Sequence, residues 1–297
     1  MDHREFIAAL PRDKLAGLAE AENAPGLFRL ALHFGLIVLF GVWIGLGGPL
    51  WWALLIPQGI AICFLFTLEH EATHKTPFRT LWLNEWVGRV CGLLIVQPFE
   101  WFRYFHLAHH RHTNIPGKDP ELLAGAKPES WRAYVWHVTG LPFWWAMIGQ
   151  TLRNSVGGDP GDYVPERARP RVLKEARVML TIYALAFSSL PVTPVLFWAW
   201  IFPALLGQPF LRLYLLAEHG RCAFVADMFR NTRTTYTNRL VRFLAWNMPY
   251  HTEHHALPQV PFHRLPELHG MMQGHHGVTS EGYAAFNRDY TSGFRKS

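Results

Sequence analysis

The stretch Asn247-Met-Pro-Tyr-His251-Thr-Glu-His254-His255 places three histidines at positions i, i+3 and i+4. Residues three and four apart lie on one face of an α-helix, so this spacing predicts three imidazoles that leave the helix on the same side. Imidazole is a good ligand for iron, zinc, copper and nickel. The stretch is therefore a candidate metal-binding helix.

Two further histidine clusters precede this stretch. His106, His109 and His110 repeat the same spacing, and His70-Glu-Ala-Thr-His74 has the i, i+4 version. Together the three clusters hold eight of the 17 histidines of the chain. Eight rings are too many for one tetrahedral ion. The sequence therefore favours a site for two metal ions.

The composition is typical of a membrane protein with a large polar face. Half of the 297 residues are hydrophobic, but the mean hydropathy is only +0.04, because long uncharged blocks alternate with very polar ones. No Lys or Arg occurs in residues 30–74 or 178–211. The formal charge is +6. We interpret the basic residues responsible for it as flanking the membrane spans, so no nucleic acid partner is expected.

The apolar blocks predict about four transmembrane helices, each near the length of about 20 residues that crosses a bilayer. Gly47-Gly48-Pro49 and Pro191-Val-Thr-Pro194 break the blocks into two hairpins. The predicted spans are residues 27–47, 50–70, 175–190 and 194–216.

The polar remainder predicts a histidine-rich catalytic cap on a single domain, residues 1–297. Both hairpin tips lack Lys and Arg, whereas the segments outside the spans are rich in them, so the positive-inside rule places the cap and all histidine clusters in the cytosol. The fold class is an all-α integral membrane protein. We expect the cap in residues 71–174 and 217–297, helices that are buried or lie in the membrane interface in 81–98 and 131–153, and loops in 114–120 and 154–171.

Two readings from other classes compete with a two-metal enzyme. His70, Glu71 and His74 match the H-E-x-x-H pattern of zinc proteases, in which the glutamate is the general base. That reading leaves the other two clusters without a role. A non-catalytic metal-binding membrane protein is the second alternative. The three isolated cysteines predict no disulfide, and His33, inside the first span, is expected to be a packed, hydrogen-bonded residue.

Taken together, the H-x-x-x-H, H-x-x-H-H and H-x-x-H-H boxes resemble those of the membrane fatty acid desaturase and hydroxylase superfamily. The resemblance implies two iron ions held almost entirely by histidines, O2 as co-substrate, and electrons from a ferredoxin or a cytochrome b5-type donor. It also implies a ninth ligand after the fourth span, where His219 stands. The implied metal ligands are His70, His74, His106, His109, His110, His219, His251, His254 and His255.

Residues beside the ligands are candidates for orienting them. Carboxylates next to ligand histidines commonly fix their rings, and some members of the superfamily place an asparagine near the metal through water. The tail histidines are expected to be structural. The candidates for orienting the ligand rings, or for reaching a metal through water, are Glu69, Glu71, Glu218, Glu253, Asn247 and His112.

The implied activity is removal of hydrogen from an unactivated C–H bond, which needs an O2-activating metal centre because no side chain can do it. The boxes do not separate desaturation of an acyl chain from hydroxylation of a lipid or of a small amino-acid-derived compound. The form of the third box looks most like bacterial members, so a bacterial inner membrane is expected. The electron donor is expected to be a separate protein.

Overall fold

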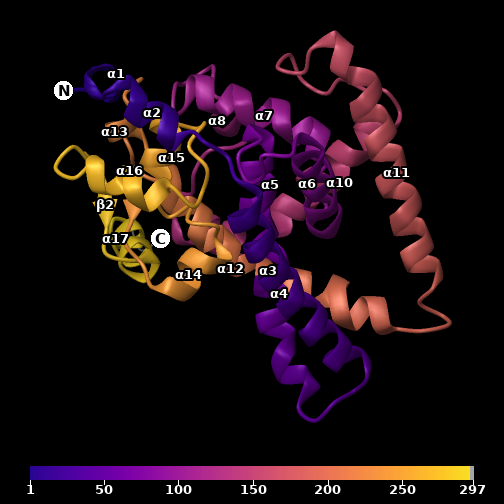
Figure 1. The fold of residues 1–297 in the computed structure, drawn as a ribbon. Coiled ribbons are helices and arrows are strands. Elements are labelled where there is room, and N and C mark those ends of the chain that lie inside the picture. Colours follow the sequence, from indigo (N-terminus) through magenta and orange to yellow (C-terminus); the bar gives the residue numbers. More distant parts are fainter. Residues whose placement is uncertain (295–297) are drawn as a thin grey trace.

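The computed structural model describes residues 1–294, and helices dominate this part of the chain (Figure 1). One short parallel pairing joins β1 to β2. The elements are α1 His3–Ala9, α2 Arg12–Leu18, α3 Asn23–Gly45, η1 Trp51–Leu54, α4 Leu55–Cys63, α5 Leu65–His74, α6 Leu81–Ile95, α7 Phe99–His112, α8 Pro120–Ala124, α9 Trp131–Val138, α10 Leu141–Ser155, η2 Glu166–Ala168, α11 Arg169–Ser188, η3 Phe197–Ile201, α12 Phe202–His219, α13 Met228–Asn231, β1 Thr234–Thr235, α14 Arg239–Leu244, α15 His251–Ala256, α16 Leu265–Met271, β2 Thr279–Ser280 and α17 Tyr283–Ser292.

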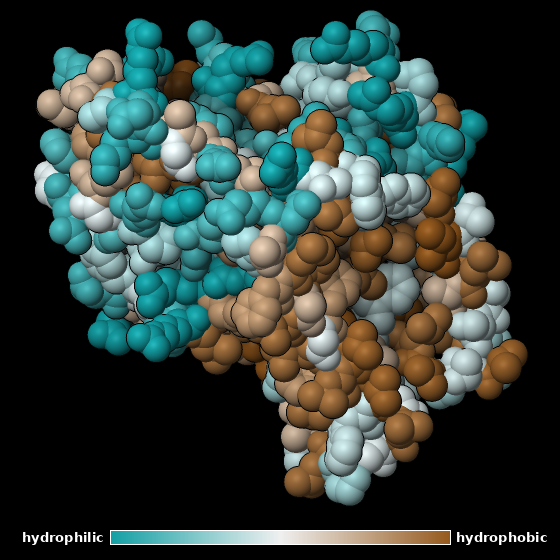
Figure 2. Space-filling view, viewed as in Figure 1, coloured by the Kyte–Doolittle hydropathy of each residue, from teal (hydrophilic) through white to brown (hydrophobic). Residues whose placement is uncertain are grey.

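Three helical stretches of the described chain are long and apolar enough to cross a membrane: Arg12–Gly45, Trp51–His74 and Phe197–His219. They contain the predicted spans 27–47, 50–70 and 194–216 almost entirely. Hydrophobic side chains gather over the lower part of the molecule, around α3 and α4, and hydrophilic ones over the upper part (Figure 2). This division fits a membrane-embedded base below a polar cap.

Most of the fourth predicted span, 175–190, lies in α11, Arg169–Ser188, which ends two residues before the span does. Its helical state is confirmed, but α11 is not among the three stretches that qualify by length and hydropathy in residues 1–294. The reason is the charge in its first turns, where Arg169, Arg171 and Glu175 lie. The predicted loop 154–171 was too long, because α11 already begins at Arg169 with a proline in its first turn, a position that the fixed φ of proline suits.

The single interfacial helix predicted for 131–153 was wrong, because two helices, α9 and α10, occupy this segment. The break is Gly140, whose φ of +73° favours glycine. A Cβ at Gly140 would also lie 2.3 Å from Cγ of Gln208, so α10 begins where the chain passes close to α12. The helix predicted in 81–98 is confirmed as α6, which ends at Ile95.

Close packing of α4 on α12 determines where the histidines at the ends of α5 and α12 lie. A Cβ on Gly59 would lie 1.9 Å from the Pro203 carbonyl oxygen, and one on Gly207 would lie 2.0 Å from the Gly59 carbonyl oxygen. Only glycine allows the two backbones to approach this closely. Both helices run away from their hairpin tips, so His74 and His219 at the ends of α5 and α12 emerge on the same side of the molecule.

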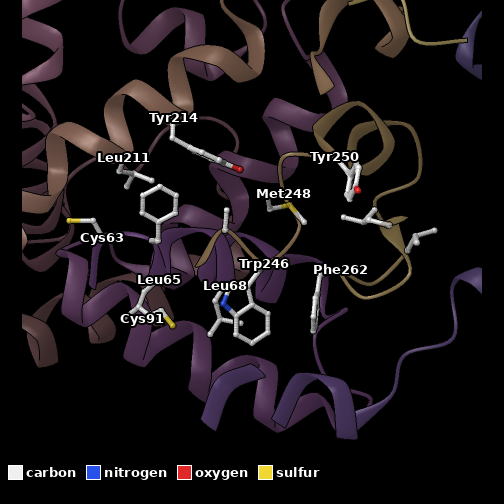
Figure 3. Close-up of a cluster of buried hydrophobic side chains, with 14 of the residues drawn as sticks. Cys63, Leu65, Leu68, Cys91, Leu211, Tyr214, Trp246, Met248, Tyr250 and Phe262 are labelled. Carbon is white, nitrogen blue, oxygen red and sulfur yellow. The ribbon is translucent and has the colours of Figure 1, made fainter. Parts of the chain in front are cut away.

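A hydrophobic cluster supports the histidine region (Figure 3). Leu65, Leu68 and Leu211 pack there with Trp246, which comes from the loop before the third histidine box. Cysteines 63, 91 and 222 are buried and free, as predicted. His33 is buried as expected: its Nε2 lies 2.8 Å from the Ala61 carbonyl oxygen, and its Nδ1 accepts a hydrogen bond from Trp246 Nε1 at 3.1 Å.

Candidate metal centre

Four helices bring nine histidines together. His70 and His74 lie in the last two turns of α5, the second box lies on α7, the third box forms α15, and His219 ends α12. The i, i+3 and i+4 positions of α7 and α15 therefore share a helical face, as the spacing predicts. Seven of the nine histidines are buried, and His74 and His110 are half-buried.

One group of ring nitrogens forms where α5, α7 and α15 meet. Nε2 of His70 lies 2.6 Å from Nε2 of His254, and Nε2 of His74 lies 2.8 Å from Nε2 of His106. The potential ligand atoms of the group lie within 4.8 Å of one another. Its members are His70, His74, His106, His110 and His254.

The second group lies beside the first and includes the histidine at the end of α12. His109, His219 and His255 can place one nitrogen each within 4.8 Å of the others. His251 joins them, because its Nε2 lies 3.2 Å from Nε2 of His219. The stacked rings of His110 and His255, 4.0 Å apart, connect the two groups. The structure thus brings together all nine predicted ligands.

Several of these rings are held from behind at Nδ1, which leaves Nε2 facing the centre. Asp119 Oδ1 lies 2.9 Å from Nδ1 of His109. The Asn231 carbonyl oxygen lies 3.1 Å from Nδ1 of His219, and Thr113 Oγ1 lies 3.1 Å from Nδ1 of His255. Two carboxylates stand slightly farther away, Glu71 Oε1 at 3.4 Å from His254 and Glu218 Oε1 at 3.5 Å from His251. A partner at one ring nitrogen that frees the other is the usual pattern of metal-ligating histidine.

Burial and mutual repulsion favour the neutral form of four box histidines. Desolvation, followed by the charges of neighbouring histidines, lowers the pKa of His106, His110, His254 and His255 well below the ordinary value. His109 differs: burial lowers its pKa, but the carboxylates of Glu121 and Asp119 outweigh this and raise it. Neutral imidazole is the form that donates a lone pair to a metal.

The predicted carboxylates fall into two sets. Glu71 and Glu218 face ligand histidines, as described above. Glu253 does not. Its Oε1 is hydrogen-bonded to His269 Nδ1 and His276 Nε2, and its Oε2 accepts a hydrogen bond from Thr234 Oγ1 at 2.6 Å. Glu69 is turned towards α6, where a Cβ on Gly92 would lie 2.6 Å from its Oε1.

Two other predicted residues lie outside both histidine groups. Asn247 donates its side-chain amide to the Phe262 carbonyl oxygen at 2.9 Å. Its predicted role beside a metal-bound water stays a prediction. His112 is half-buried at the end of α7.

The sequence reasoning missed several contributors to this region. Asp119, Thr113 and the Asn231 carbonyl contact Nδ1 of predicted ligand histidines, and none of them belongs to a histidine box. Asp119 lies at the end of the segment expected to be only a loop, and its position before Pro120 marks the N-cap of a helix, a signal that was available. The tail residues His269 and His276 converge on Glu253.

A cavity of about 770 Å³ opens beside the centre. His70, His106, His109 and His251 reach its wall. Cavities of this size hold whole small-molecule ligands. Aromatic and aliphatic side chains of α5, α7 and α10, together with Tyr163, form much of the remaining wall: Phe66, Trp101, Phe102, Phe105, Met147 and Tyr163.

Comparison with known proteins identifies the class that this fold and centre define. The family model for fatty acid desaturases matches residues 49–279, and the chain belongs to this family. It is 25% identical over 256 residues to the sn-1 oleoyl-lipid 12-desaturase of Arthrospira platensis, covering 77% of this chain and 71% of that one. It is 24% identical over 297 residues to the enzyme of the same name from Synechocystis sp., with 92% and 82% covered.

A mouse sphingolipid delta(4)-desaturase/C4-monooxygenase is 27% identical over 248 residues, which cover 78% of this chain and 69% of the relative. The protein is therefore an oxidoreductase with the membrane-embedded base described above.

The residues present fit iron. Nine buried or half-buried imidazoles supply nitrogen donors, and both ring nitrogens of His110 and Nε2 of His255 find no hydrogen-bond partner in residues 1–294. Nitrogen-rich sites of this kind suit iron. The zinc-protease alternative fits poorly, because Oε2 of Glu71 is held by Thr76 Oγ1 and the Phe262 amide instead of facing a substrate.

Proposed function

We propose that the protein is a di-iron enzyme that uses O2 and electrons to desaturate a fatty acyl chain of a lipid. The convergence of nine histidines into two adjoining groups beside a mostly apolar cavity carries this proposal. When bound, the irons would supply the O2 activation that an unactivated C–H bond requires. One ion would be held by the group around His70 and His254, the other by the group around His219.

The residues of the chain would position the substrate. The aromatic side chains of α7, including Trp101, Phe102 and Phe105, give an acyl chain an apolar surface that ends at His106. Burial of apolar groups there excludes water from the reacting carbons. The carboxylates Glu71 and Glu218 would keep the rings of His254 and His251 oriented as the oxidation state changes.

Hydroxylation is the second candidate, because one relative carries both a desaturase and a monooxygenase activity in its name. Both reactions begin with the same hydrogen abstraction, so the same cavity and ligands serve either. The amino-acid-derived substrate class belongs to this second candidate.

We further propose a single domain with four spans, in which α11 completes the second hairpin. Its apolar half follows Arg177 and ends at the predicted turn before α12. The cap and its histidines would then face the cytosol of a bacterial inner membrane. Electrons would come from a separate ferredoxin or cytochrome b5-type protein, attracted by the net charge of +6.

The first experiment is the iron content of the protein, purified in mild detergent after iron supplementation, combined with lipid profiling of the producing cells. We expect about two irons per chain from the two-ion capacity of the centre, and new double bonds or hydroxyls in the lipids. His254→Ala should lose iron and lipid products while still inserting in the membrane. The control is His275→Ala: His275 lies against Phe6, away from the centre, so this variant should retain iron and products. Full turnover by His254→Ala would contradict the proposal.

A further inference from the structure

One corner of the cavity is polar and carries charge. Beyond the aromatic wall, the side chains of Glu121, Lys127, His137, Arg212 and Glu218 line it. The two carboxylates already have neighbours: Glu121 approaches His109 Nδ1 at 3.4 Å and Lys127 Nζ at 4.0 Å, and Glu218 faces His251. A lining made only for a hydrocarbon chain would not need these groups.

Arg212 is a cation of this corner that makes no ion pair in the described residues, although the carboxylates of Glu121 and Glu218 lie farther away in the same corner. It lies on α12, a candidate membrane-spanning stretch, where an arginine is costly and usually serves a function. Its Nε donates to Gln208 Oε1 at 3.2 Å and its guanidinium lies 4.4 Å from the Phe143 ring centre. In residues 1–294, no carboxylate oxygen lies within 4.0 Å of the guanidinium, and its buried Nη2 has no hydrogen-bond acceptor.

His137 adds a second open polar atom to the same corner. Its Nε2 is buried without a hydrogen-bond partner in the described chain. Burial, followed by the charge of Arg212, lowers the pKa of His137 to about 4, so the ring is neutral near pH 7 and can donate one hydrogen bond. In the tautomer that carries its proton on Nε2, His137 gives this corner a second donor beside Arg212 Nη2, and the two N–H groups can bind oxygen atoms.

We propose that Arg212 and His137 bind the anionic end of the substrate, a carboxylate or a phosphate carried by an acyl chain. This inference deepens the proposed function and rests on it. A guanidinium in an apolar wall is stabilised when an anion accepts its free N–H groups. Arg212 precedes His219 by seven residues of α12, about 10 Å along the helix axis. The anchor therefore sets which carbons reach the histidines, and Arg212 determines substrate selectivity.

The test compares binding of three probes with the same chain: hexadecanoate, hexadecyl phosphate and hexadecanol. Binding is measured on the purified full-length protein in detergent, without turnover, by displacement of a fluorescent alcohol. We expect the wild-type protein to bind at least one anionic probe about tenfold more tightly than the alcohol, the usual effect of a charge-assisted hydrogen bond. The anion that binds more tightly identifies the source as a fatty acid or a phospholipid.

Variants assign the preference to Arg212. Arg212→Gln should lose the preference for an anion and keep the affinity for hexadecanol, and Arg212→Lys should retain part of the preference because the charge remains. Arg132→Gln removes the same charge from an exposed position of α9 and should leave all three affinities unchanged. Iron content, measured on each variant, verifies that the centre is folded.

Two results would overturn the anchor: equal binding of all three probes by the wild-type protein, or an unchanged anion preference in an iron-containing Arg212→Gln variant. These outcomes are separate from the proposed function. Missing double bonds and hydroxyls in cells that produce the iron-loaded protein would refute that function, even if the anion preference were intact.

Discussion

Glu71 shows how one carboxylate serves two purposes. Its Oε1 faces His254 Nδ1, and its Oε2 accepts hydrogen bonds from Thr76 Oγ1 at 3.0 Å and the Phe262 amide at 3.1 Å. It thus connects a ligand ring of α15 to the end of α5 and to the segment after the third box. A buried carboxylate with these partners orients the ring and raises its basicity.

We therefore expect Glu71→Gln to weaken iron binding about 10- to 100-fold, because the substitution keeps the shape and replaces the oxygen acceptor behind His254 with an amide donor. The measurement is iron retention against increasing chelator, followed by metal analysis. Glu267→Gln is the matched control, since the Glu267 side chain is 53% exposed and contacts Arg264. Equal retention by wild type and Glu71→Gln would show that the carboxylate does not support the ligand.

The histidine boxes could be assigned from the sequence because the spacing of ligands on a helix is local. The carboxylates could be assigned only in part, since neighbouring helix positions point about 100° apart: Glu71 and Glu218 face histidine rings, as expected, but two others do not. Glu253 stands directly before His254 and yet faces His269 and His276. Asp119 was missed for the converse reason, because only the fold brings the start of α8 to the back of His109.

At the scale of elements, the crossing of α4 and α12 determines where the ligands meet. Their backbones touch at Gly59 and Gly207. We expect Gly207→Val to force the helices apart and to lower the free energy of unfolding by about 3 kcal/mol, at the upper end for overpacked cores. The measurement is thermal unfolding in detergent.

Gly35→Val provides the control, since a Cβ at Gly35, an exposed position of α3, meets nothing within 4 Å. Its stability should stay within about 0.5 kcal/mol of wild type. An unfolding temperature of Gly207→Val equal to that of Gly35→Val would mean that the close approach is not needed.

The apolar blocks identified the long helices of the membrane-embedded base, because spans are encoded by composition over many residues, but the short helices of the cap, such as α13 and α14, were not predicted. The break between α9 and α10 was missed. Gly140 lies in a segment of strong aromatic character, and the need for a glycine there comes from Gln208 on a distant helix. Contacts of this kind are invisible in a local pattern.

At the scale of the whole molecule, the orientation of the two hairpins can be tested by labelling. Leu46 and Val192, at the two tips, are 81% and 87% exposed, and Val156, in the cap, is 80% exposed. We expect Leu46→Cys and Val192→Cys to react with a membrane-impermeant maleimide applied to the outer side of the inner membrane, and Val156→Cys to react only after lysis. The native cysteines are buried, so the background should be low.

Labelling of Val192→Cys from the cytosolic side alone would show that α11 does not cross the membrane. That result would leave the three apolar stretches in place and remove only the fourth span. The sequence could suggest four spans because the turn around Pro191 resembles the first hairpin tip.

The distances between ligands along the chain have a consequence for how the enzyme is made. His70 and His254, whose Nε2 atoms nearly touch, are separated by 184 positions, and His109 and His219 by 110. The centre therefore cannot exist on the ribosome until α15 has been synthesised and both hairpins have docked. Iron would bind last in assembly, and it would connect helices from the first, middle and last parts of the chain. In an iron-poor cell, the segment that carries α15 would lack its metal contacts, and we expect the complete chain to be degraded by proteases before it becomes active.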